Sequence, residues 1–313
     1  MRIAIFGAGG VGGYFGGRLS RAGEDVLFLA RGEHLRAIRE HGLQVESVNG
    51  DFVIHPAQAV ENPAQGGRVD LVIVGVKAWQ VPEAAEAMRP MVGPETSVLT
   101  LQNGVEAPDQ VAAVLGPSVV LGGSANIISF TAGPGRIRHL GGPASIRFGE
   151  LDNRGSERSL MLKETLSRAG IPAEIAPETR IALWEKFLFI VPVGGVGAVT
   201  RAPIGLLRTI PETKRMLYQG MREILGVAHA RGISLDETVI DRTMRFLDTL
   251  PPEGTTSMQR DIMGGHPSEL EAWNGAVVRL GKRAGVPTPL HDFLYSSLLP
   301  MERKSRGQVR FPG

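Results

Sequence analysis

The stretch IAIFGAGGVGGY at Ile3–Tyr14 decides the fold of the N-terminal part of this chain. A short run of β-branched and aromatic residues passes directly into a G-x-G-x-x-G loop, and the loop passes into residues with helical spacing. In such a loop Gly7 makes a tight turn, Gly9 lets the backbone approach phosphates, and Gly12 lets the helix pack closely on the strand. The sequence therefore predicts a site for a dinucleotide pyrophosphate. The residues of this predicted site are Gly7, Ala8, Gly9, Gly10, Val11 and Gly12.

The surroundings of the loop matter because 41 of the 313 residues are glycine, so the spacing alone arises easily by chance. The alternative is an ordinary glycine-rich turn. A strand before the loop, and Phe15 and Leu19 on one helical face after it, favour the nucleotide site.

The end of the next predicted strand, Asp25–Arg31, indicates which dinucleotide binds. Arg31 lies about 20 residues after the glycines, where an NAD enzyme carries an acidic residue for the ribose hydroxyls and an NADP enzyme a cation for the 2′-phosphate. Because a guanidinium matches a phosphate well, Arg31 predicts NADP (NADPH) as the cofactor. Two alternatives remain open: Arg31 is an ordinary solvated arginine, or Glu33 binds the ribose.

Composition limits the class of protein. A chain with 42% apolar and 5% aromatic residues is typical of a globular enzyme, and a formal charge of +2 gives no reason to expect nucleic acid or an anionic membrane. The absence of cysteine excludes disulfides, thiolate metal sites and a cysteine nucleophile, and the seven histidines lack metal-ligand spacing, so no metal is expected. The apolar stretches look too short or too broken by glycine to span a bilayer. We expect a cytoplasmic protein.

Alternating apolar runs and helical patterns predict an α/β fold with a parallel, doubly wound sheet in residues 1–178. Between Ile127 and Phe148, short runs split by glycine and proline predict antiparallel strands at the edge of this sheet. Other strands are expected at Val69–Val76, Ser97–Leu101, Val119–Leu121 and Ala173–Ile175, and helices at Val81–Met91, Val105–Leu115 and Leu160–Ala169.

After Pro177 the strand signals stop, so residues 179–313 are expected to form an all-α domain. The segment Asp152–Arg158 is expected to be a polar connection, and Met301–Gly313 a loose polar tail. Helical spacing is found at Thr179–Val193, Pro211–Arg231, Leu235–Leu250 and Pro267–Ala284.

Polar side chains follow two of the predicted strands. Lys77 comes after VIVGV and Asn103 after VLTLQ, at the carboxyl ends where open parallel sheets bind ligands. The alternative for both is turn and cap chemistry, since Asn-Gly is a frequent turn dipeptide. Their position favours a role in ligand binding.

Three residues of the helical half are candidates for chemistry. Lys186, one of six lysines, lies in the strongly apolar run LWEKFLFI, where burial favours an ammonium that can give up its proton. The alternative is a snorkelling side chain with its head in water. For Glu269 and Ser257 the simplest explanation is a helix N-terminus or cap.

Taken together, these residues resemble the ketopantoate reductase (2-dehydropantoate 2-reductase) family. The resemblance implies a Rossmann domain followed by a helical domain similar to the C-terminal domain of 6-phosphogluconate dehydrogenase. It also implies NADPH reduction of ketopantoate, a small-molecule 2-oxo acid, to pantoate in pantothenate synthesis, and it leaves a homodimer open. The resemblance is carried by Gly7–Gly12, Arg31, VKAWQ at 76–80, QNG at 102–104, WEK at 184–186, Ser257-Met258, Asp261, Ser268-Glu269 and Asn274-Gly275.

The resemblance also implies roles for single residues. Lys186 matches the catalytic lysine, which would protonate the alkoxide formed at the ketone, and Glu269 matches a carboxylate that orients the substrate hydroxyl and holds Lys186. Ser257 matches a serine that binds the substrate. Lys77 matches a polar group on the cofactor side, and Asn103 one that contacts cofactor and substrate.

Four positions depart from the family pattern. Ile190 and Gly194 stand where the family usually has asparagines one and two turns after the catalytic lysine, and Ile204 and Gly254 replace two more. Because a site that hydrogen-bonds its substrate loses affinity when those partners are absent, these departures predict a more apolar and roomier pocket beside Lys186. Two other hypotheses therefore stay open: a reductase of a different, more apolar 2-oxo acid, and a non-catalytic NADP-binding sensor.

Overall fold

Strand β1 (Arg2–Phe6) lies inside a ten-stranded sheet in the computed structural model, which describes residues 1–310. The strand order is β4-β3-β9-β8-β7-β6-β1-β2-β5, and β10 pairs with β9. From β5 through β8 all neighbouring strands are parallel, so the predicted doubly wound sheet is confirmed. The order reverses at β1, since β2 lies on one side of it and β6 on the other. Open α/β sheets bind ligands at such a switch point.

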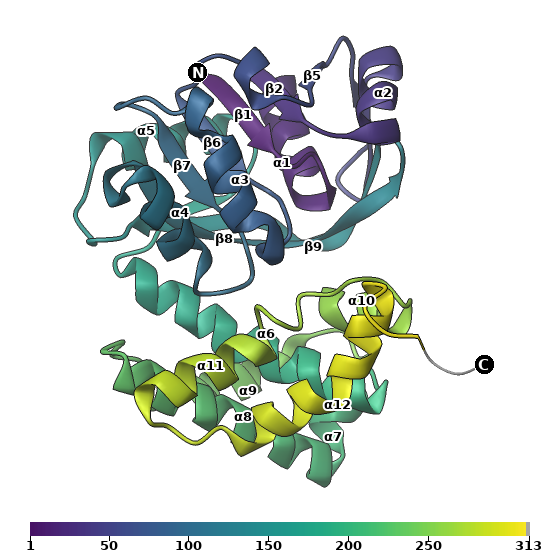
Figure 1. The fold of residues 1–313 in the computed structure, drawn as a ribbon, viewed down its shortest axis with the longest axis vertical. Coiled ribbons are helices and arrows are strands. Elements are labelled where there is room, and N and C mark those ends of the chain that lie inside the picture. Colours follow the sequence, from purple (N-terminus) through teal and green to yellow (C-terminus); the bar gives the residue numbers. More distant parts are fainter. Residues whose placement is uncertain (311–313) are drawn as a thin grey trace. The chain divides into compact units, whose positions relative to one another are not determined.

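The sheet belongs to the first of two units, Met1–Ala182 (Figure 1). Its strands are β1, β2 (Asp25–Leu29), β3 (Leu43–Ser47), β4 (Phe52–Ile54), β5 (Gln58–Val60), β6 (Leu71–Val74), β7 (Ser97–Thr100), β8 (Val120–Gly133), β9 (Arg136–Glu150) and β10 (Ala173–Ile175). Its α-helices are α1 (Gly10–Arg21), α2 (Gly32–His41), α3 (Val81–Ala87), α4 (Ala107–Leu115) and α5 (Glu157–Arg168). Single 3₁₀ turns lie at Pro63–Gln65, Ala78–Gln80, Arg89–Met91 and Pro117–Val119.

Both faces of the sheet are covered by helices. Side chains alternate along β1, so Ile3 and Ile5 pack with α1, α2 and α5, whereas Ala4 and Phe6 pack with α3 and α4. Because neither face is open to water, the central strands carry nearly continuous apolar residues, which is the pattern that made them easy to predict.

The region Ile127–Phe148 is antiparallel, as predicted, but it does not form the edge of the sheet. Strands β8 and β9 are single long strands of 14 and 15 residues, paired with each other through several register shifts. Strand β9 also pairs with β3, and β3 pairs with β4, which lies at the edge of the sheet. Sequence analysis predicted no element between Arg31 and Val69, where α2, β3, β4 and β5 lie. Strands β3, β4 and β5 are partly exposed, so they lack the unbroken apolar run that marks the buried central strands.

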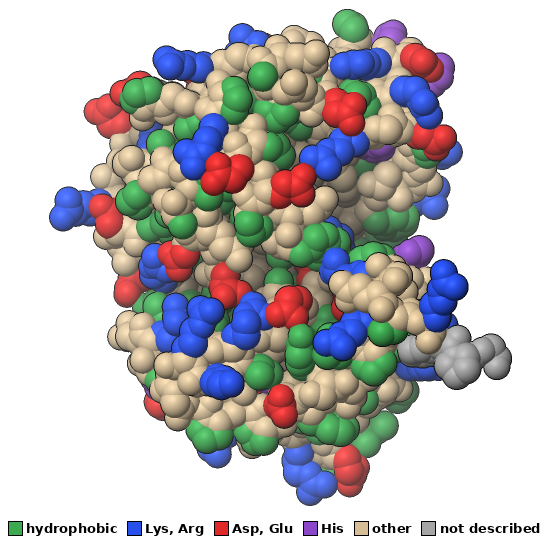
Figure 2. Space-filling model, viewed as in Figure 1, with side chains coloured by type: hydrophobic (Ala, Val, Ile, Leu, Met, Phe, Trp, Pro, Cys, Tyr) green, Lys and Arg blue, Asp and Glu red, His purple; other side chains and the backbone are tan. Residues whose placement is uncertain are grey.

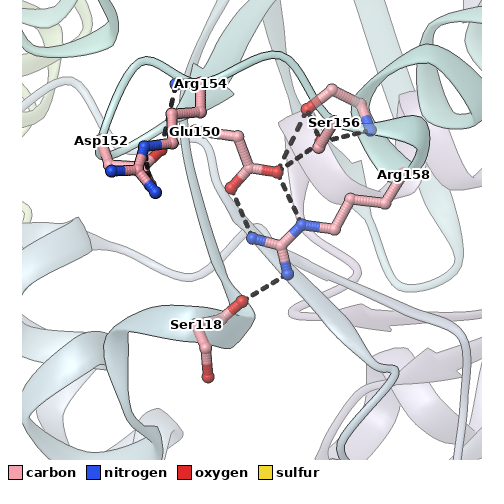
Figure 3. Close-up of polar contacts among 7 residues, drawn as sticks. Ser118, Glu150, Asp152, Arg154, Ser156 and Arg158 are labelled. Carbon is pink, nitrogen blue, oxygen red and sulfur yellow. Dashed lines mark hydrogen bonds and ion pairs between the residues drawn. The ribbon is translucent and has the colours of Figure 1, made fainter.

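The polar segment Asp152–Arg158 is an ordered connection rather than a loose one (Figure 3). Ser156 caps α5 by accepting the Ser159 N–H, and it donates to Glu150 Oε1 at 2.6 Å. Arg158 forms a two-point pair with the Glu150 carboxylate and donates to the carbonyl oxygen of Ser118. Burial acts to raise the pKa of the Glu150 carboxyl, but the hydrogen bonds from Arg158 and Ser156 outweigh it, so the pKa lies below its ordinary value.

The second unit begins at Leu183, and its described residues, 183–310, form helices and no strand, as predicted. The chain enters it through α6 (Thr179–Thr200), which continues past the predicted end at Val193 in spite of Pro192. The other helices are α7 (Ile204–Thr209), α8 (Pro211–Ala230), α9 (Val239–Thr249), α10 (Ser257–Met263), α11 (Asn274–Ala284) and α12 (Pro289–Ser305).

Helix α6 corrects the expectation that no apolar stretch is long enough to cross a membrane. By length and composition its 22 residues qualify, but 72% of its apolar stretch is buried within the protein. Such burial is typical of the central helix of a globular unit, and Phe187, Leu188 and Val191 are among its fully buried residues.

The C-terminal part departs most from the sequence analysis. Helix α12 was not predicted; its first N–H groups, at Leu290 and His291, are capped by the Glu223 carboxylate of α8 at 2.9 and 3.0 Å. The helix runs to Ser305, so the prediction of a loose tail from Met301 is wrong as far as Ser305, and residues 311–313 lie outside the described part. Helix α11 begins at Asn274 rather than Pro267, because the preceding residues form a separate turn.

Candidate nucleotide and catalytic sites

The glycine loop joins β1 to the start of α1. Gly7 has a φ of +102°, a conformation that favours glycine, and it makes the sharp turn out of the strand. Helix α1 begins after Gly9, and no side chain caps its first N–H groups. These groups lie at the positive end of the helix dipole and fit an anion such as a pyrophosphate.

Gly12 and Gly75 let α1 and two strand ends come together. A Cβ atom on Gly12 would collide with the carbonyl oxygen of Gly7 and would lie 2.9 Å from Ile5 Cγ2. A Cβ atom on Gly75 would lie 2.9 Å from the same Gly7 oxygen. The sequence analysis assigned close packing to Gly12 but missed Gly75, because only the pairing of β6 with β1 brings it there.

Gly9 and Gly10 differ in the space around them. A Cβ atom on Gly9 would meet only Thr131 Oγ1, at 4.0 Å, so the loop is open there. A Cβ atom on Gly10 would lie 2.7 Å from Phe130 Cα, because β8 packs against the start of α1. The open space at Gly9 and the uncapped helix end both fit the phosphates of a dinucleotide. Thr131 beside this space was missed, since nothing near it in the sequence marks it.

His34 fixes the start of α2 on the glycine loop. Its Nδ1 accepts the Gly135 N–H at 3.0 Å, which leaves Nε2 to donate to the Ala8 carbonyl oxygen at 2.8 Å. The sequence analysis missed this residue too. The contact holds the end of β2, where the ribose of a dinucleotide is expected, in a fixed relation to the phosphate loop.

Arg31 lies directly before α2 and is exposed. Its guanidinium is 3.5 Å from the Glu83 carboxylate, and the other candidate for the ribose, Glu33, pairs with Arg36 at the same distance. Exposed pairs of this kind contribute little free energy, so both Arg31 and Glu33 can turn to a ligand at small cost.

The polar residues predicted at strand ends follow β6 and β7, in agreement with the sequence analysis. Lys77 follows β6, and Asn103 follows β7 and is half-buried. Beside them Gln102, only 6% exposed, donates to the carbonyl oxygens of Val74 and Val76 at 2.9 Å each. Its Oε1 has no hydrogen-bond partner within residues 1–310. Gln102 therefore ties the two strand ends together and leaves one buried acceptor at the ligand-binding edge of the sheet.

In the second unit, Lys186 lies on α6 and is partly buried among apolar side chains. Burial lowers the pKa of its ammonium from 10.5 to about 8, although the Glu269 carboxylate acts in the opposite direction. Glu269 itself is 6% exposed and lies in the turn before α11. The structure thus brings the two predicted residues into electrostatic contact. An ammonium with a pKa of about 8 can serve as an acid near neutral pH.

The helix-cap explanations for Ser257 and Glu269 do not hold in the structure. Thr256 caps α10, its Oγ1 accepting the Gln259 N–H at 3.2 Å, and Ser257 is the first residue of that helix. Glu269 lies five residues before the start of α11, whose N-cap is Trp273. Neither side chain is needed to begin a helix, so both remain candidates for contact with a substrate.

Two of the four departures from the family pattern pack against each other. The Ile204 N–H donates to the Gly254 carbonyl oxygen at 2.9 Å, and a Cβ atom on Gly254 would lie 3.3 Å from Ile204 Cδ1. An apolar contact therefore stands where the family usually has two amide side chains.

Gly194 shows that the expectation of a roomier pocket is wrong at this position. A Cβ atom there would lie 2.7 Å from Cζ3 of Trp273 and 3.2 Å from Cε of Met258. Trp273 is fully buried, and its backbone N–H, not its indole N–H, donates to the Glu269 carbonyl oxygen at 3.0 Å. The turn and α6 therefore run side by side, with Glu269 near Lys186 and Trp273 against Gly194. At Gly194 itself the neighbours are apolar and the indole ring fills the space, whereas the buried amides of Asn274 and Gln259 lie against Gly195 and Gly197 of the same helix.

Charged side chains of both signs are mixed on the surface of the protein (Figure 2). On the face drawn in Figure 2, Lys and Arg side chains alternate with Asp and Glu side chains, in keeping with a formal charge of +2. Within residues 1–310 there is no group of three or more His, Asp or Glu side chains that could hold a metal ion.

Comparisons with known proteins show the family. The model of the family "Ketopantoate reductase PanE/ApbA" matches residues 3–153, and the model of its C-terminal domain matches residues 178–302. The chain belongs to the ketopantoate reductase family. A 2-dehydropantoate 2-reductase of Mesorhizobium japonicum is 30% identical over 319 residues, which cover 93% of this chain and 95% of that protein.

Solved structures agree with this family. A PanE/ApbA family ketopantoate reductase from Ralstonia eutropha JMP134 has 32% identity and a TM-score of 0.89, covering 98% of this chain and 100% of its own. D-mandelate dehydrogenase, solved with NADH and anilino(oxo)acetate, has 26% identity and a TM-score of 0.90, covering 98% and 99%. The ketopantoate reductase family member described here is therefore an oxidoreductase that uses a nicotinamide cofactor.

Proposed function

We propose that this enzyme reduces a 2-oxo acid with NADPH, and that the substrate is ketopantoate, which becomes pantoate. The observation that carries the proposal is the Lys186 ammonium, whose pKa burial lowers to about 8 and which has the Glu269 carboxylate beside it. The family names of the relatives support ketopantoate as substrate. A sensor without catalysis would have no use for such an acid, so this third hypothesis is the weakest.

The chemistry needs a hydride at the ketone carbon and a proton at the ketone oxygen. NADPH, when bound at the glycine loop, supplies the hydride. As charge develops on the oxygen, Lys186 stabilises it and transfers a proton from Nζ, which leaves a neutral amine that regains a proton from solvent. Glu269 keeps the amine in place and orients the substrate hydroxyl. Ser257 donates a hydrogen bond to the substrate carboxylate.

The choice of NADPH over NADH rests on Arg31. Because a charge-assisted contact with the 2′-phosphate is lost, Arg31→Ala should raise the KM for NADPH about tenfold or more and leave that for NADH nearly unchanged. Arg36→Ala, at an exposed arginine of α2, the helix that begins directly after Arg31, is the matched control and should change neither value. Equal losses with both cofactors would contradict the assignment, and a loss with Glu33→Ala alone would favour ribose binding by Glu33 and therefore NAD.

The second candidate function is reduction of a more apolar 2-oxo acid, and the Trp273 ring against Gly194 favours it. D-mandelate dehydrogenase, a structural relative bound to an aromatic oxo acid, also supports it. The test compares kcat/KM for ketopantoate with that for 2-oxo acids carrying alkyl or aryl side chains. If one polar contact is worth on the order of 1.4 kcal/mol, an apolar pocket should prefer the latter, or favour ketopantoate by less than about tenfold. A preference for ketopantoate by several orders of magnitude would remove this candidate.

The place and assembly of the enzyme are part of the proposal. We place it in the cytoplasm, because its long apolar helix α6 is mostly buried within the protein. The partner is a small 2-oxo acid rather than nucleic acid or a membrane, and a homodimer stays open. Light scattering of the purified protein measures the assembly directly.

A further inference from the structure

Glu302 near the end of α12, and Arg306 directly after it, form hydrogen bonds with the turn that carries Glu269. Glu302, 4% exposed, accepts hydrogen bonds from the Ser268 N–H at 3.0 Å and from Ser268 Oγ at 2.6 Å. Arg306 donates from Nε to Glu302 Oε1 at 2.7 Å and from Nη2 to the Ser268 carbonyl oxygen at 3.1 Å. Ser268 Oγ also accepts the Leu270 N–H at 3.2 Å. We call Glu302, Arg306 and Ser268 the α12 clamp.

The clamp engages the backbone on both sides of Glu269. The turn belongs to no helix or strand, and the Ser268 N–H and C=O and the Leu270 N–H have side chains as their partners. Ser268 is fully buried; its backbone N–H donates to Glu302, and its carbonyl oxygen accepts a hydrogen bond from Arg306. A buried charge pair is costly to break from one side, because the remaining charge is left uncompensated. The position of this turn therefore depends on residues more than 30 positions further along the chain.

The geometry points to Glu302 and Arg306 as positioning residues, which hold the turn so that the Glu269 carboxylate stays beside the Lys186 ammonium. This inference rests on the proposed function, in which that pair performs the proton transfer. It gives a role to the segment that the sequence analysis expected to be a loose tail.

The surroundings of Lys186 set the direction of the expected effect. Glu269 is the group whose charge raises the pKa of Lys186, against the effect of burial. If the turn loosens, Glu269 moves away and the pKa of Lys186 falls below about 8. Other charged groups on these elements are Glu185 of α6, paired with Arg242 of α9 at 3.0 Å, the interacting Arg260 and Asp261 of α10, and the clamp itself. Glu271 lies in the turn as well; it pairs with Arg279 and accepts a hydrogen bond from Tyr295 Oη at 2.6 Å.

The test is an NMR titration of protein labelled with ¹³C at lysine Cε. Only six lysine signals are present, and Lys186→Met identifies the relevant one. Glu302→Gln and Arg306→Gln should both lower the pKa of Lys186, by about one pH unit if the carboxylate moves a few ångströms. If only nearby charge mattered, the two variants would act in opposite directions, since one removes a negative and the other a positive charge.

Two further variants keep the test decisive. Ser268→Ala removes only the hydroxyl contacts, changes no charge and should lower the pKa of Lys186 by less; it serves if the charge variants do not fold. Arg303→Gln, on the exposed side of the same turn of α12, is the matched control and should leave the pKa unchanged. An Arg306→Gln or Ser268→Ala protein that keeps its melting temperature and the wild-type pKa of Lys186 would overturn the inference.

Activity separates this inference from the proposed function. The alkaline limb of kcat/KM should move to lower pH in the clamp variants together with the pKa measured by NMR, while the KM for NADPH stays constant. If the wild-type enzyme reduces no 2-oxo acid, the proposed function fails. The NMR titration still reports whether the clamp holds Glu269 beside Lys186.

Discussion

Substituting Gly194 by asparagine, the residue usual in the family, tests how the pocket wall is built. In this chain the new Cβ atom would lie 2.7 and 3.0 Å from Cζ3 and Cε3 of Trp273 and 3.2 Å from Met258 Cε. The obstacle is a fully buried ring rather than the end of a flexible side chain, so overpacking should cost about 1–3 kcal/mol. The amide would also have to find hydrogen-bond partners in this filled space, and any group left unpaired there adds to the cost.

The partner substitution is Trp273→Leu, which opens the space that the amide needs. Alone it should cost about 2–4 kcal/mol, somewhat less than a change to alanine, because leucine refills part of the cavity. The double variant Gly194→Asn/Trp273→Leu should lose less stability than the sum of the single variants, by about 1–3 kcal/mol, because the two side chains compete for one space.

The assay is urea unfolding, with Gly226→Asn as the matched control. Gly226 is also a helical glycine, but its Cβ atom would meet only Val286 Cγ1, at 3.5 Å, an ordinary contact. We further expect the double variant to gain kcat/KM for ketopantoate relative to an aryl 2-oxo acid. If Gly194→Asn is no less stable than Gly226→Asn, or if the two substitutions at 194 and 273 are simply additive, the packing argument is refuted.

Three further predictions concern other parts of the molecule. Gly12→Ala should lower the melting temperature by several degrees, since overpacking costs about 1–3 kcal/mol. Gly9→Ala should fold normally but bind NADPH at least about tenfold more weakly. Wild-type NADPH affinity in a titration of Gly9→Ala would contradict the proposed pyrophosphate site. Lys186→Ala should lower kcat by on the order of 10² to 10⁴ and leave the affinity for NADPH intact. The wild-type rate of reduction should fall as the pH rises above about 8, because Lys186 then loses the proton it donates. A pH profile that stays flat to pH 9 would require another proton donor. The pKa of Glu150 is lowered in the folded state, so its pair with Arg158 stabilises the protein above the ordinary pKa of 4.5, and this stabilisation is lost as the pH falls below that value. Glu150→Gln should therefore lower the free energy of unfolding by about 2 kcal/mol at pH 7 and by progressively less in acid, as measured by urea unfolding.

Much of the nucleotide-binding unit could be predicted because its signals are local. The glycine loop, the apolar strand before it and the helix after it are neighbours in the sequence, and the parallel strands carry unbroken apolar runs because both faces of the sheet are covered. The strands of three to five residues between Arg31 and Val69 could not be predicted, because their pairing with distant strands, and not their own sequence, makes them strands.

The candidate catalytic residues were also found from the sequence, but their surroundings were not. Lys186 stood out as a rare lysine in an apolar helix, and Glu269 through a resemblance. Residues far apart in the sequence form these surroundings. The Trp273 ring fills the space beside Gly194, and Glu302 and Arg306 form hydrogen bonds with the backbone of Ser268. No local pattern marks such contacts, since each depends on which surfaces the helices bring together.

By itself, the sequence determined the Rossmann-type loop, the order of the main strands and helices, and the residue types from which a nicotinamide-dependent reductase is built. Only the tertiary structure decided that α12 is a helix, since its cap is the Glu223 carboxylate of α8. Only the structure showed that an indole ring fills the space beside Gly194, and that the Glu269 carboxylate acts against the effect of burial on the pKa of Lys186. Local sequence fixes backbone preferences and the chemistry of side chains, whereas caps, filled space and shifted pKa values depend on atoms that folding brings together from distant positions.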